Sequence, residues 1–565
     1  MEQRGERFGE GKAQGKAPGT SPDAIYYRGK ILTMNPANPT ATAEAVAVKG
    51  GRIVAVGDER SVLALAGEGT EKIDLEGRTL LPGFIDSHGH FPWNGNDELY
   101  GVKLYSPPIG TIRNIDELLA ALKAKARTLA PGEWILGRGY DDSLLEDRRH
   151  PTRHDLDQVS TTSPVFLVHI SAHVGVANSV ALKMAGLTRD TADLDGGFFR
   201  KDSHGELNGI LEGPPAYTTV QNIIPARTET QDLAGIRKAC EIYAAAGVTT
   251  AQNGWAFYPE LGLLKKACAS GDLFLRVVVW PFASSLEEMT RYPTTKSGTD
   301  LTDNHMVTLG AAKLWADGSI YVYTAWLSQP YHTPPEGKPH YRGYSRFKEK
   351  AQLIHMIKEL HSRGWQTAIH TIGDQATQDA LEGWAAAQEA MPRADARHIC
   401  NHAHLAREDQ LERMKELGIT PSFFVTHTYF WGDRHRDIFV GPDRAKRLCA
   451  CRTALDRGLR ITFHNDTPVT PISPLMSVWS AVNRLTSSGK ELGPELRIMV
   501  PEALRAVTID AAWQNFEEGI KGSIEVGKLA DFAVLEENPL EVDPLKIKDI
   551  RVVRTIVGGR TVFEA

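Results

Sequence analysis

The stretch LPGFIDSHGH, from Leu81 to His90, is where the predicted strand pattern of the central fold begins. It is an apolar run that ends in two histidines, His88 and His90, separated by one residue. If the run is an extended strand, side chains at positions i and i+2 point to the same side, so both imidazoles can bind one metal ion. The alternative is two ordinary polar residues at a strand end, because a single His-x-His motif has low specificity.

Beyond this stretch, apolar segments of β type alternate with amphipathic helical segments. This alternation predicts an α/β protein with parallel strands and crossover helices. Eight strands can be picked out, each with an apolar start and a polar end: LLPGFIDSHGH, GVTTAQNG, FLRVVVWP, VTLGAAKLWADG, WQTAIHTIGD, RHICNHAH, ITPSFFVTH and LRITFHND. Eight is the number of strands that closes a (β/α)8 TIM-like barrel, and an open doubly wound sheet is the alternative.

The chain of 565 residues is too long for one compact domain of ordinary size. Residues 24–81 and 510–565 contain short strands and turns, and we expect these two segments to form one composite β-sandwich. The barrel is predicted over residues 82–509, with an insertion at about 95–235 that covers the active site. Residues 1–23 are rich in Gly, Lys and Glu and are predicted to be a disordered tail.

The last forty residues contain a hairpin signal, since Gly558 and Gly559 lie between two β-branched runs.

Composition narrows the class of partner. The formal charge is -6, from 64 basic and 70 acidic residues without a long block of either sign, so neither a nucleic acid nor a membrane partner is expected. Five scattered cysteines without a CxxC spacing indicate a reducing compartment. With no signal peptide and no apolar stretch of roughly 18 residues, we expect a cytoplasmic protein that binds a small molecule. The oligomeric state is left open, with a homo-oligomer as one alternative.

Four more polar residues end predicted strands: Lys313, His370, His402 and Asp466. In a barrel, the C-terminal ends of the strands carry the catalytic groups. His370 and His402 are 32 residues apart, which is one strand-helix-strand unit, so we expect them on adjacent strands. A lysine beside a divalent ion is unfavourable unless its amine is modified or neutral. Each residue alone has an ordinary structural explanation, but all of them together at the ends of strands favour a metal site.

Ten motifs, in order from about Ile25 to the C-terminus, carry a family resemblance: GGRIVAVG, LPGFIDSHGH, GRGYDD, AHVGVANSVAL, GVTTAQNG, KLWADGS, IHTIGDQA, NHAH, HNDTPV and GSIEVGKLADFAVL. With them the sequence resembles the amidohydrolase superfamily of metal-dependent hydrolases. Within it, the sequence is similar to the amidohydrolase-3 branch, which includes the N-substituted formamide deformylases. The set of motifs is far more specific than any one of them.

This resemblance implies a centre of two divalent metal ions, zinc in the first place, with manganese, nickel or iron as alternatives. The implied ligands are His88 and His90 for one ion, His370 and His402 for the other, with Lys313 and Asp466. Carboxylated Lys313 would bridge the ions, which turns the unfavourable cation into an anionic oxygen ligand. Asp466 matches the family's general base, and nearby ions should depress its pKa and keep it ionised.

The resemblance also implies the reaction, which is hydrolysis of a linear C-N amide bond other than a peptide bond. The substrate would be an N-acyl or N-formyl compound with an apolar or aromatic group. A hydroxide that bridges the two metals would attack, with Asp466 as the general base. The alternatives are a cyclic amidase, a heterocycle deaminase or a non-catalytic scaffold with the same fold. All six ligand positions are filled, which argues against the scaffold.

The chain departs from the usual pattern of the branch near the predicted ligands. Asn401-His402-Ala403 stands where Glu-His-Ala is common, and His464-Asn465-Asp466 stands where Gly-Ser-Asp is common. His402-x-His404 is a second i, i+2 pair, so either histidine can be the ligand, and the motif favours His402. On a strand, His464 shares a face with Asp466 and can orient that carboxylate or contact substrate.

The remaining site predictions concern the substrate pocket. His173 and His427 match positions that resemble pocket-lining histidines of the branch. Trp93 and Trp315 lie near the motifs and can line an aromatic pocket, together with Trp326, Tyr429 and Trp431. The predicted substrate-binding residues are therefore His173, His427, His464, Trp93 and Trp315. Ordinary packing is the alternative for each of them.

Overall fold

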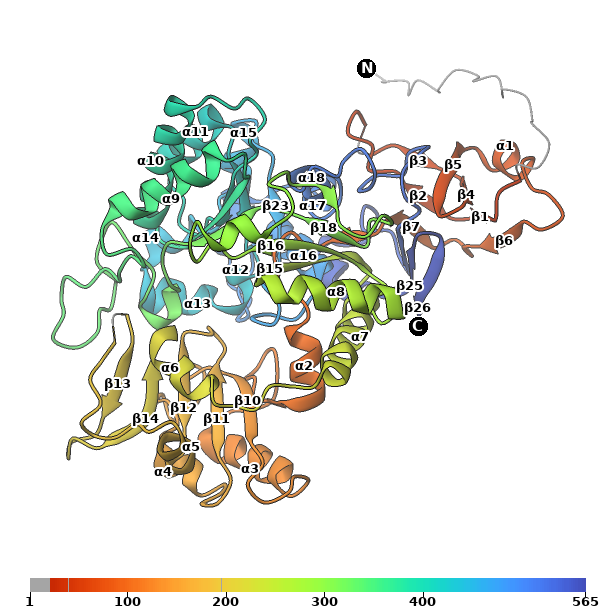
Figure 1. The fold of residues 1–565 in the computed structure, drawn as a ribbon. Helices are drawn as coiled ribbons and strands as arrows, with labels where there is room; N and C mark the ends of the chain where they lie inside the picture. Colours follow the sequence, from red (N-terminus) through yellow and green to blue (C-terminus); the bar gives the residue numbers. More distant parts are fainter. Residues whose placement is uncertain (1–20, 39, 195) are drawn as a thin grey trace.

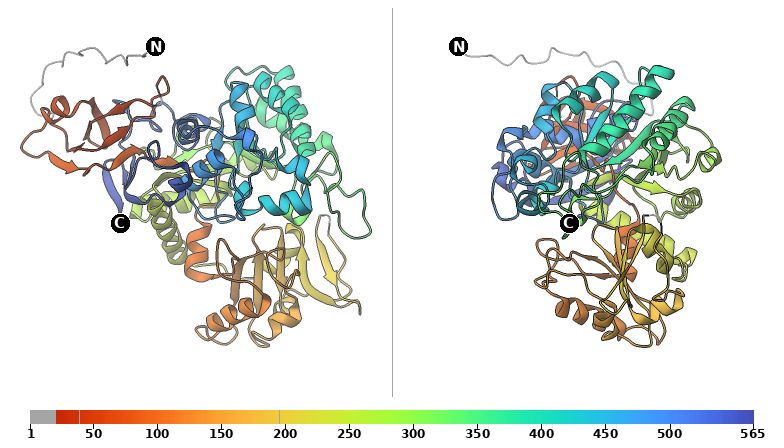
Figure 2. Two further views of the ribbon diagram at one scale, coloured as in Figure 1. Left: turned by 180° about the vertical axis from the view of Figure 1, so that it is seen from behind. Right: turned by 90° about the vertical axis from the view of Figure 1, so that its left-hand side faces the viewer.

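The structure is a computed structural model that describes residues 21–38, 40–194 and 196–565. All but three residues of the tail predicted at 1–23 lie outside these ranges. Three groups of sheets make up the described chain (Figures 1 and 2): a central α/β part, a sheet region coloured orange to yellow, and a β region where both ends of the chain meet. No helix that the structure describes has the length and hydropathy needed to cross a bilayer.

The central part contains two sheets in which the barrel-type strands pair in parallel. The first has the order β17-β18-β16-β15-β8, with β8 (Phe84–Ile85), β15 (Val248–Ala256), β16 (Arg276–Pro281), β18 (Val307–Leu309) and an antiparallel edge strand β17 (Thr299–Asp300). The second has the order β19-β20-β21-β22-β23, with β19 (Ala312–Trp315), β20 (Thr367–Thr371), β21 (Ile399–His402), β22 (Thr420–Phe423) and β23 (Thr462–Phe463). The prediction of an α/β fold with parallel strands is confirmed.

Backbone hydrogen bonds link the two central sheets at both edges. Near the junction of β18 and β19, the Ala283 N–H donates to the Lys313 carbonyl at 2.9 Å. At the opposite edge, the His90 N–H donates to the Thr467 carbonyl at 2.8 Å. The chain segments that carry predicted ligands are therefore held together by the backbone.

Helices connect the central strands and pack around them, and the apolar faces of most of these helices join strand residues in the largest hydrophobic cluster of the described residues. These helices are α7 (Glu229–Ala245), α8 (Tyr258–Ser270), α9 (Lys350–Ser362), α10 (Asp374–Ala390), α11 (Glu408–Leu417), α15 (Cys451–Asp456), α16 (Pro474–Asn483), α17 (Val500–Ala506) and α18 (Ile509–Gln514). In α11, Leu411 and Met414 are buried at a helical spacing, and Gly418 ends the helix with a left-handed φ of 66°. Short helices follow β22: α12 (His427–Phe430), α13 (Gly432–Arg434), a π-helix (His435–Phe439) and α14 (Pro442–Ala445).

The predicted insertion contains its own six-stranded sheet of order β13-β14-β12-β11-β10-β9. Its strands are β9 (Val102–Lys103), β10 (Ile135–Tyr140), β11 (Val165–His169), β12 (Val174–Ala177), β13 (Phe198–Lys201) and β14 (Leu207–Glu212). Its helices are α2 (Trp93–Tyr100), α3 (Ile115–Ala126), α4 (Arg153–Asp157), α5 (Ser179–Met184) and α6 (Pro214–Gln221). Buried residues such as Leu118, Leu122 and Val165 form a separate core under this sheet.

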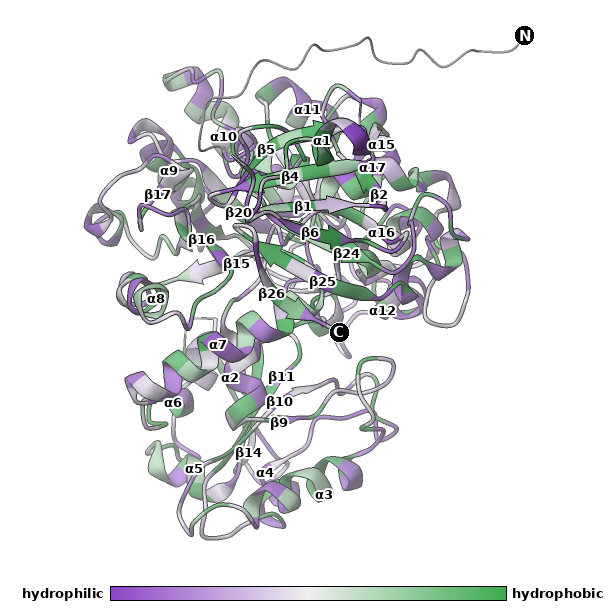
Figure 3. Ribbon diagram, turned by 90° about the vertical axis from the view of Figure 1, so that its right-hand side faces the viewer, coloured by the Kyte–Doolittle hydropathy of each residue, from purple (hydrophilic) through white to green (hydrophobic). Residues whose placement is uncertain are grey.

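Strands from both ends of the chain share one sheet, of order β26-β25-β24-β7-β2-β3. It combines β2 (Lys30–Leu32), β3 (Thr42–Ala43) and β7 (Thr79–Pro82) with β24 (Phe532–Leu535), β25 (Val552–Val557) and β26 (Arg560–Glu564). A second sheet contains β1 (Ala24–Tyr27), β4 (Ala45–Lys49), β5 (Arg52–Gly57) and β6 (Glu71–Asp74), beside α1 (Glu59–Leu63). One hydrophobic cluster contains Val46 from the second sheet and Phe532 from the six-stranded sheet that both chain ends share, which we call the mixed sheet. Hydrophobic residues predominate in strands such as β4 and β24, whereas α7 carries both polar and apolar residues (Figure 3).

The predicted hairpin is confirmed, since β25 and β26 pair antiparallel around Gly558 and Gly559, whose φ angles of 55° and 76° suit glycine.

Candidate metal centre and cavity

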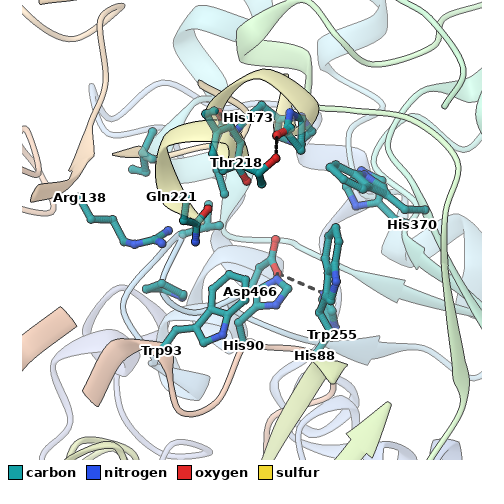
Figure 4. A pocket seen from close by; sticks show the side chains of 18 of the residues that line it. His88, His90, Trp93, Arg138, His173, Thr218, Gln221, Trp255, His370 and Asp466 are labelled. Carbon is teal, nitrogen blue, oxygen red and sulfur yellow. Dashed lines mark hydrogen bonds and ion pairs between the residues drawn. The ribbon is translucent and has the colours of Figure 1, made fainter. Parts of the chain in front are cut away.

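A cavity of about 340 Å³ lies where the central strands end and the insertion begins (Figure 4). Nine predicted site residues line it: His88, His90, Trp93, His173, Lys313, Trp315, His370, His402 and Asp466. The central strands and the segments directly after them supply seven of these residues, and the insertion supplies His173 and Trp93. Two predicted substrate-binding residues, His427 and His464, do not line the cavity.

Three predicted ligands converge at the floor of the cavity. The Asp466 Oδ1 atom lies 3.2 Å from His88 Nε2 and 3.1 Å from His90 Nε2. These three ligand atoms all lie within 4.8 Å of one another, close enough to bind one cation. Apart from these two imidazole nitrogens, the buried Asp466 Oδ1 atom has no donor among the described residues, so a cation bound by all three side chains would satisfy it. The residues therefore fit a divalent metal ion.

The protonation of these groups suits metal binding. Burial raises the pKa of Asp466, but the imidazoles of His88 and His90 outweigh that effect and hold the pKa well below its usual range. Burial, together with the positive charge of Lys313, lowers the pKa of His88 well below its usual value. An ionised carboxylate beside a neutral imidazole is the combination that binds zinc.

Neighbouring residues fix the position of the His88 ring. Strand β8 ends at Ile85, so His88 and His90 lie in the segment after the strand and not on an extended strand as the spacing predicts. The ring of Trp280 stacks on the His88 ring with centroids 5.2 Å apart. A side chain at position 254 would place its Cβ 2.2 Å from His88 Nδ1, so only glycine leaves room for the imidazole.

Lys313 lies in β19, buried beside these residues. Its Nζ atom lies 3.4 Å from His88 Nε2. Burial lowers the pKa of this amine to about 7, while the negative charge of Asp466 acts in the opposite direction. Near neutral pH a large fraction of the amine is therefore uncharged, which removes part of the repulsion of a nearby metal ion.

His370 and His402 lie side by side on neighbouring strands, with ring centroids 4.4 Å apart. The His370 Nε2 atom lies 3.0 Å from the Gly318 carbonyl oxygen, which can only accept a hydrogen bond. Nε2 therefore carries the proton, and Nδ1 keeps the lone pair with which His370 can bind a metal. Asp317 holds this region together by accepting hydrogen bonds from the N–H groups of Ile372 and Gly373.

The structure separates the second His-x-His pair. His402 lines the cavity, whereas His404 is buried behind it, with its ring centroid 4.1 Å from that of His427. The His427 Nδ1 atom lies 3.1 Å from His435 Nε2, within the same buried group. This placement favours His402 as the ligand and places His427 among packed side chains.

The family model Amidohydro_3, described as "Amidohydrolase family", matches residues 71–563 of the sequence. The chain belongs to the amidohydrolase family. The predicted family is thereby confirmed. This amidohydrolase is 28% identical to the N-substituted formamide deformylase of Arthrobacter pascens over 556 residues, which cover 96% of this chain and 98% of that protein.

Two solved structures of archaeal proteins resemble this amidohydrolase over most of its length. Both are described as uncharacterized metal-dependent hydrolases, one from Pyrococcus horikoshii OT3 and one from Pyrococcus furiosus. Their TM-scores are 0.72 and 0.71, each at 26% sequence identity. They cover 92% of this chain, and 99% and 100% of their own chains.

Aromatic side chains form much of the cavity wall in this amidohydrolase. Trp93 stacks on the His90 ring with centroids 4.6 Å apart, and Trp315 packs against Trp255 at 4.8 Å. Trp93 and Trp315 thus line the pocket as the sequence predicts, whereas Trp255 was missed although it directly follows the motif GVTTAQNG. Trp326, Tyr429 and Trp431 do not line this cavity.

The insertion of the amidohydrolase contributes polar groups that sequence patterns did not identify as site residues. Arg138, inside the motif GRGYDD, points into the cavity (Figure 4). Tyr217 and Ser171 also line the cavity. The Arg138 Nε atom lies 3.1 Å from the Asp97 carboxylate. From sequence alone, an arginine on a strand is predicted to be exposed. Only the fold of the insertion directs the Arg138 side chain into the cavity.

The imidazole of His173 provides a hydrogen-bond donor of fixed orientation on the same wall of the cavity. The Nη2 atom of Arg346 lies 3.1 Å from His173 Nδ1, and a guanidinium can only donate. His173 therefore accepts at Nδ1 and carries its proton on Nε2. Burial and the charge of Arg346 lower its pKa well below the usual value, which keeps the ring neutral.

Proposed function

We propose that this amidohydrolase is a metal-dependent enzyme that hydrolyses a linear C-N amide bond other than a peptide bond. The substrate class we propose is an N-acyl or N-formyl compound with an apolar or aromatic group. The observation that carries this proposal is the convergence of His88, His90 and Asp466 on one point, with buried Lys313 beside them. The likeness to an N-substituted formamide deformylase supports the N-formyl class.

We also propose that the parallel strands of the two central sheets close into one (β/α)8 barrel over residues 82–509, with β18 and β19 as two parts of one of the eight predicted strands. Parallel pairing and the hydrogen bonds at both edges support closure. The mixed sheet and its shared hydrophobic cluster support a composite β-sandwich made from residues 24–81 and 510–565. Cavity-lining residues in the insertion at about 95–235 support a covering role for it.

The ligand set we propose is His88, His90 and Asp466 for one ion and His370 and His402 for a second, with carboxylated Lys313 between them. Imidazole and carboxylate ligands favour zinc, and manganese, nickel or iron would also be accepted. When bound, such ions lower the pKa of water towards neutrality and polarise the scissile carbonyl.

The protein's own groups then have distinct tasks. Ionised Asp466 accepts a proton from the attacking water and returns it to the leaving amine. The Nε2–H group of His173 donates a hydrogen bond to a substrate oxygen. The aromatic wall that includes Trp93, Trp255 and Trp315 binds the apolar group of the substrate and excludes water.

A substrate screen with Zn²⁺-loaded protein tests the proposal. Hydrolysis of N-formyl or N-acyl arylalkylamines, with release of amine and carboxylate, supports it. Ammonia release from aminated heterocycles, or opening of cyclic amides, would instead establish the deaminase or cyclic amidase alternative. Asp466→Asn should lower kcat by about 10²–10⁴-fold. Asp443→Asn is the control, because that side chain is 94% exposed.

Metal analysis tests the centre itself. Lys313→Ala should hold less divalent metal than the wild type after identical loading in bicarbonate, while its circular dichroism is unchanged. Full metal content and full activity in this variant would exclude an essential bridging lysine.

We also propose that the protein acts in the cytoplasm and that its binding partner is a small-molecule amide, not a nucleic acid or a membrane. The oligomeric state is left open, with a homo-oligomer as one alternative.

A further inference from the structure

His464 occupies one of the positions where this chain departs from the usual pattern of the branch, and its contacts give it a defined task. The side chain is 1% exposed and lies behind the cavity wall. Its Nε2 atom lies 3.0 Å from His402 Nδ1, and its Nδ1 atom lies 3.0 Å from Ser422 Oγ. His402 ends β21, Ser422 lies in β22 and His464 follows β23, so one ring connects three neighbouring strands.

The hydrogen-bond partners define where the protons lie. The amide nitrogen of Asn401 is placed 3.1 Å from His402 Nε2 and can only donate. His402 therefore keeps a lone pair on Nε2 and carries its proton on Nδ1, which donates to His464 Nε2. His464 in turn carries its proton on Nδ1 and donates to Ser422 Oγ. The three bonds thus run in one direction, from Asn401 to Ser422. A metal ion bound at His402 Nε2 would replace the Asn401 donor and leave the other two bonds in place.

We infer that His464 is a positioning residue of the metal centre, which holds His402 in the tautomer whose Nε2 lone pair binds the ion. This inference rests on the proposed function. An imidazole can bind a metal only through an unprotonated nitrogen, and the partner of its other nitrogen selects the tautomer and the ring orientation. Neither ring nitrogen of His404 has a hydrogen-bond partner among the described residues, so no such support holds that ring.

The histidine at position 464, in place of the glycine that is common in the branch, adds two side-chain hydrogen bonds. With the glycine that is common in the branch, the His402 Nδ1–H group would lose this acceptor and Ser422 would lose its imidazole partner. The notion that His464 orients Asp466 has no support, because the described hydrogen bonds of its ring go to His402 and Ser422. Its neighbour Asn465 supports the chain instead, accepting from the Ser473 N–H at the start of α16.

The test measures Zn²⁺ affinity in the full chain by competition with a chromophoric chelator, which needs no substrate. His464→Leu removes both hydrogen bonds at a similar side-chain volume. We expect it to weaken binding of the Zn²⁺ ion that His370 and His402 are proposed to hold by about 10–100-fold. His464→Gln keeps an acceptor for His402 and should weaken binding less. The absorption spectrum of Co²⁺-loaded protein should change in His464→Leu and stay close to wild type in His464→Gln.

His398→Leu is the matched control. His398 is also 1% exposed and uses both ring nitrogens, with Nδ1 2.9 Å from Thr367 Oγ1 and Nε2 2.8 Å from His361 Nδ1, but it does not line the cavity. The His398→Leu variant should be less stable than the wild type and keep wild-type Zn²⁺ affinity. Wild-type affinity in folded His464→Leu, or an equal loss in His398→Leu, would overturn the role of His464. Wild-type protein that binds no Zn²⁺ would overturn the proposed function itself.

Discussion

At the scale of single residues, two glycines make room for the candidate metal centre. Gly89 lies between the two histidines of the opening motif, and a Cβ there would lie 2.5 Å from Asp86 Oδ2. A Cβ on Gly254 would lie 2.2 Å from His88 Nδ1 and 2.9 Å from the Gly89 carbonyl. Such distances are far inside van der Waals contact, so any larger residue must displace the imidazole or the backbone beside it.

Gly254→Ala is therefore predicted to displace the His88 ring. We expect Zn²⁺ affinity to fall roughly tenfold or more, as for other changes that misplace a ligand, with loss of activity in proportion. Gly262→Ala is the matched control, because nothing lies within 4 Å of a Cβ at that exposed position in α8. It should leave Zn²⁺ affinity unchanged and raise helix stability by about 0.5–1 kcal/mol. Equal Zn²⁺ affinities in the two variants would contradict the steric account.

At the scale of elements, a buried ion pair joins a central strand to the mixed terminal sheet. Arg276 begins β16, and Asp531 immediately precedes β24. The pair is bidentate, with Arg276 Nε 2.6 Å from Asp531 Oδ2 and Arg276 Nη2 2.9 Å from Asp531 Oδ1. Both side chains are less than 5% exposed. Removal of one partner from such a pair leaves an uncompensated buried charge, which costs about 3–5 kcal/mol.

Asp531→Asn should accordingly lower the free energy of unfolding by about 3–5 kcal/mol at pH 7. Burial raises the pKa of Asp531, but Arg276 outweighs it and leaves the folded-state pKa below the usual value. The unfolded value is about 3.9. The stabilisation is therefore fully present above about pH 4 and is lost as the pH falls through the folded-state pKa.

Urea unfolding followed by circular dichroism between pH 7 and pH 3 measures this difference. The gap between wild type and Asp531→Asn should be constant near neutral pH and shrink in acid. Asp74→Asn serves as the control, since its partner Arg28 is 63% exposed and a surface ion pair contributes only about 0–1 kcal/mol. A gap that widens as the pH falls would contradict the assignment.

At the scale of the whole molecule, the C-terminal hairpin is part of the central packing. Strand β25 pairs with β24, which lies between it and β7 from the other end of the chain. The Thr555 hydroxyl donates to the Ala244 carbonyl in α7 at 2.7 Å. The last residues of the chain therefore cover both a sheet edge and a helix of the central part (Figure 2).

Deletion of residues 551–565 should expose the β24 edge and the face of α7, because both would lose their partner. We expect loss of cooperative thermal unfolding and aggregation, measured by circular dichroism and size-exclusion chromatography. Thr555→Val removes only the hydrogen bond to Ala244 and should cost about 1 kcal/mol. A truncated protein that stays monodisperse and unfolds at the wild-type temperature would show that the hairpin is dispensable.

The sequence by itself was enough to predict the parallel α/β alternation, the Gly558-Gly559 hairpin, the family and the six candidate ligands. The alternation and the hairpin depend on local periodicity and turn residues, which are properties of neighbouring residues, whereas the family and the roles of the ligands are implied by the resemblance of ten motifs to known proteins. Seven of the nine predicted site residues that line the cavity come from the central parallel strands or the segments directly after them, whose ends meet at one edge. The other two, Trp93 and His173, come from the insertion.

The remaining features of the site depend on how distant segments pack in the tertiary structure. This structure placed His402 on the cavity wall and His404 behind it, although both share one motif. It joined His464 to His402 and not to Asp466, and turned Arg138 of the insertion into the cavity. The physical reason is that these contacts join segments tens to hundreds of residues apart. Their geometry depends on how strands and layers pack, which no local pattern encodes.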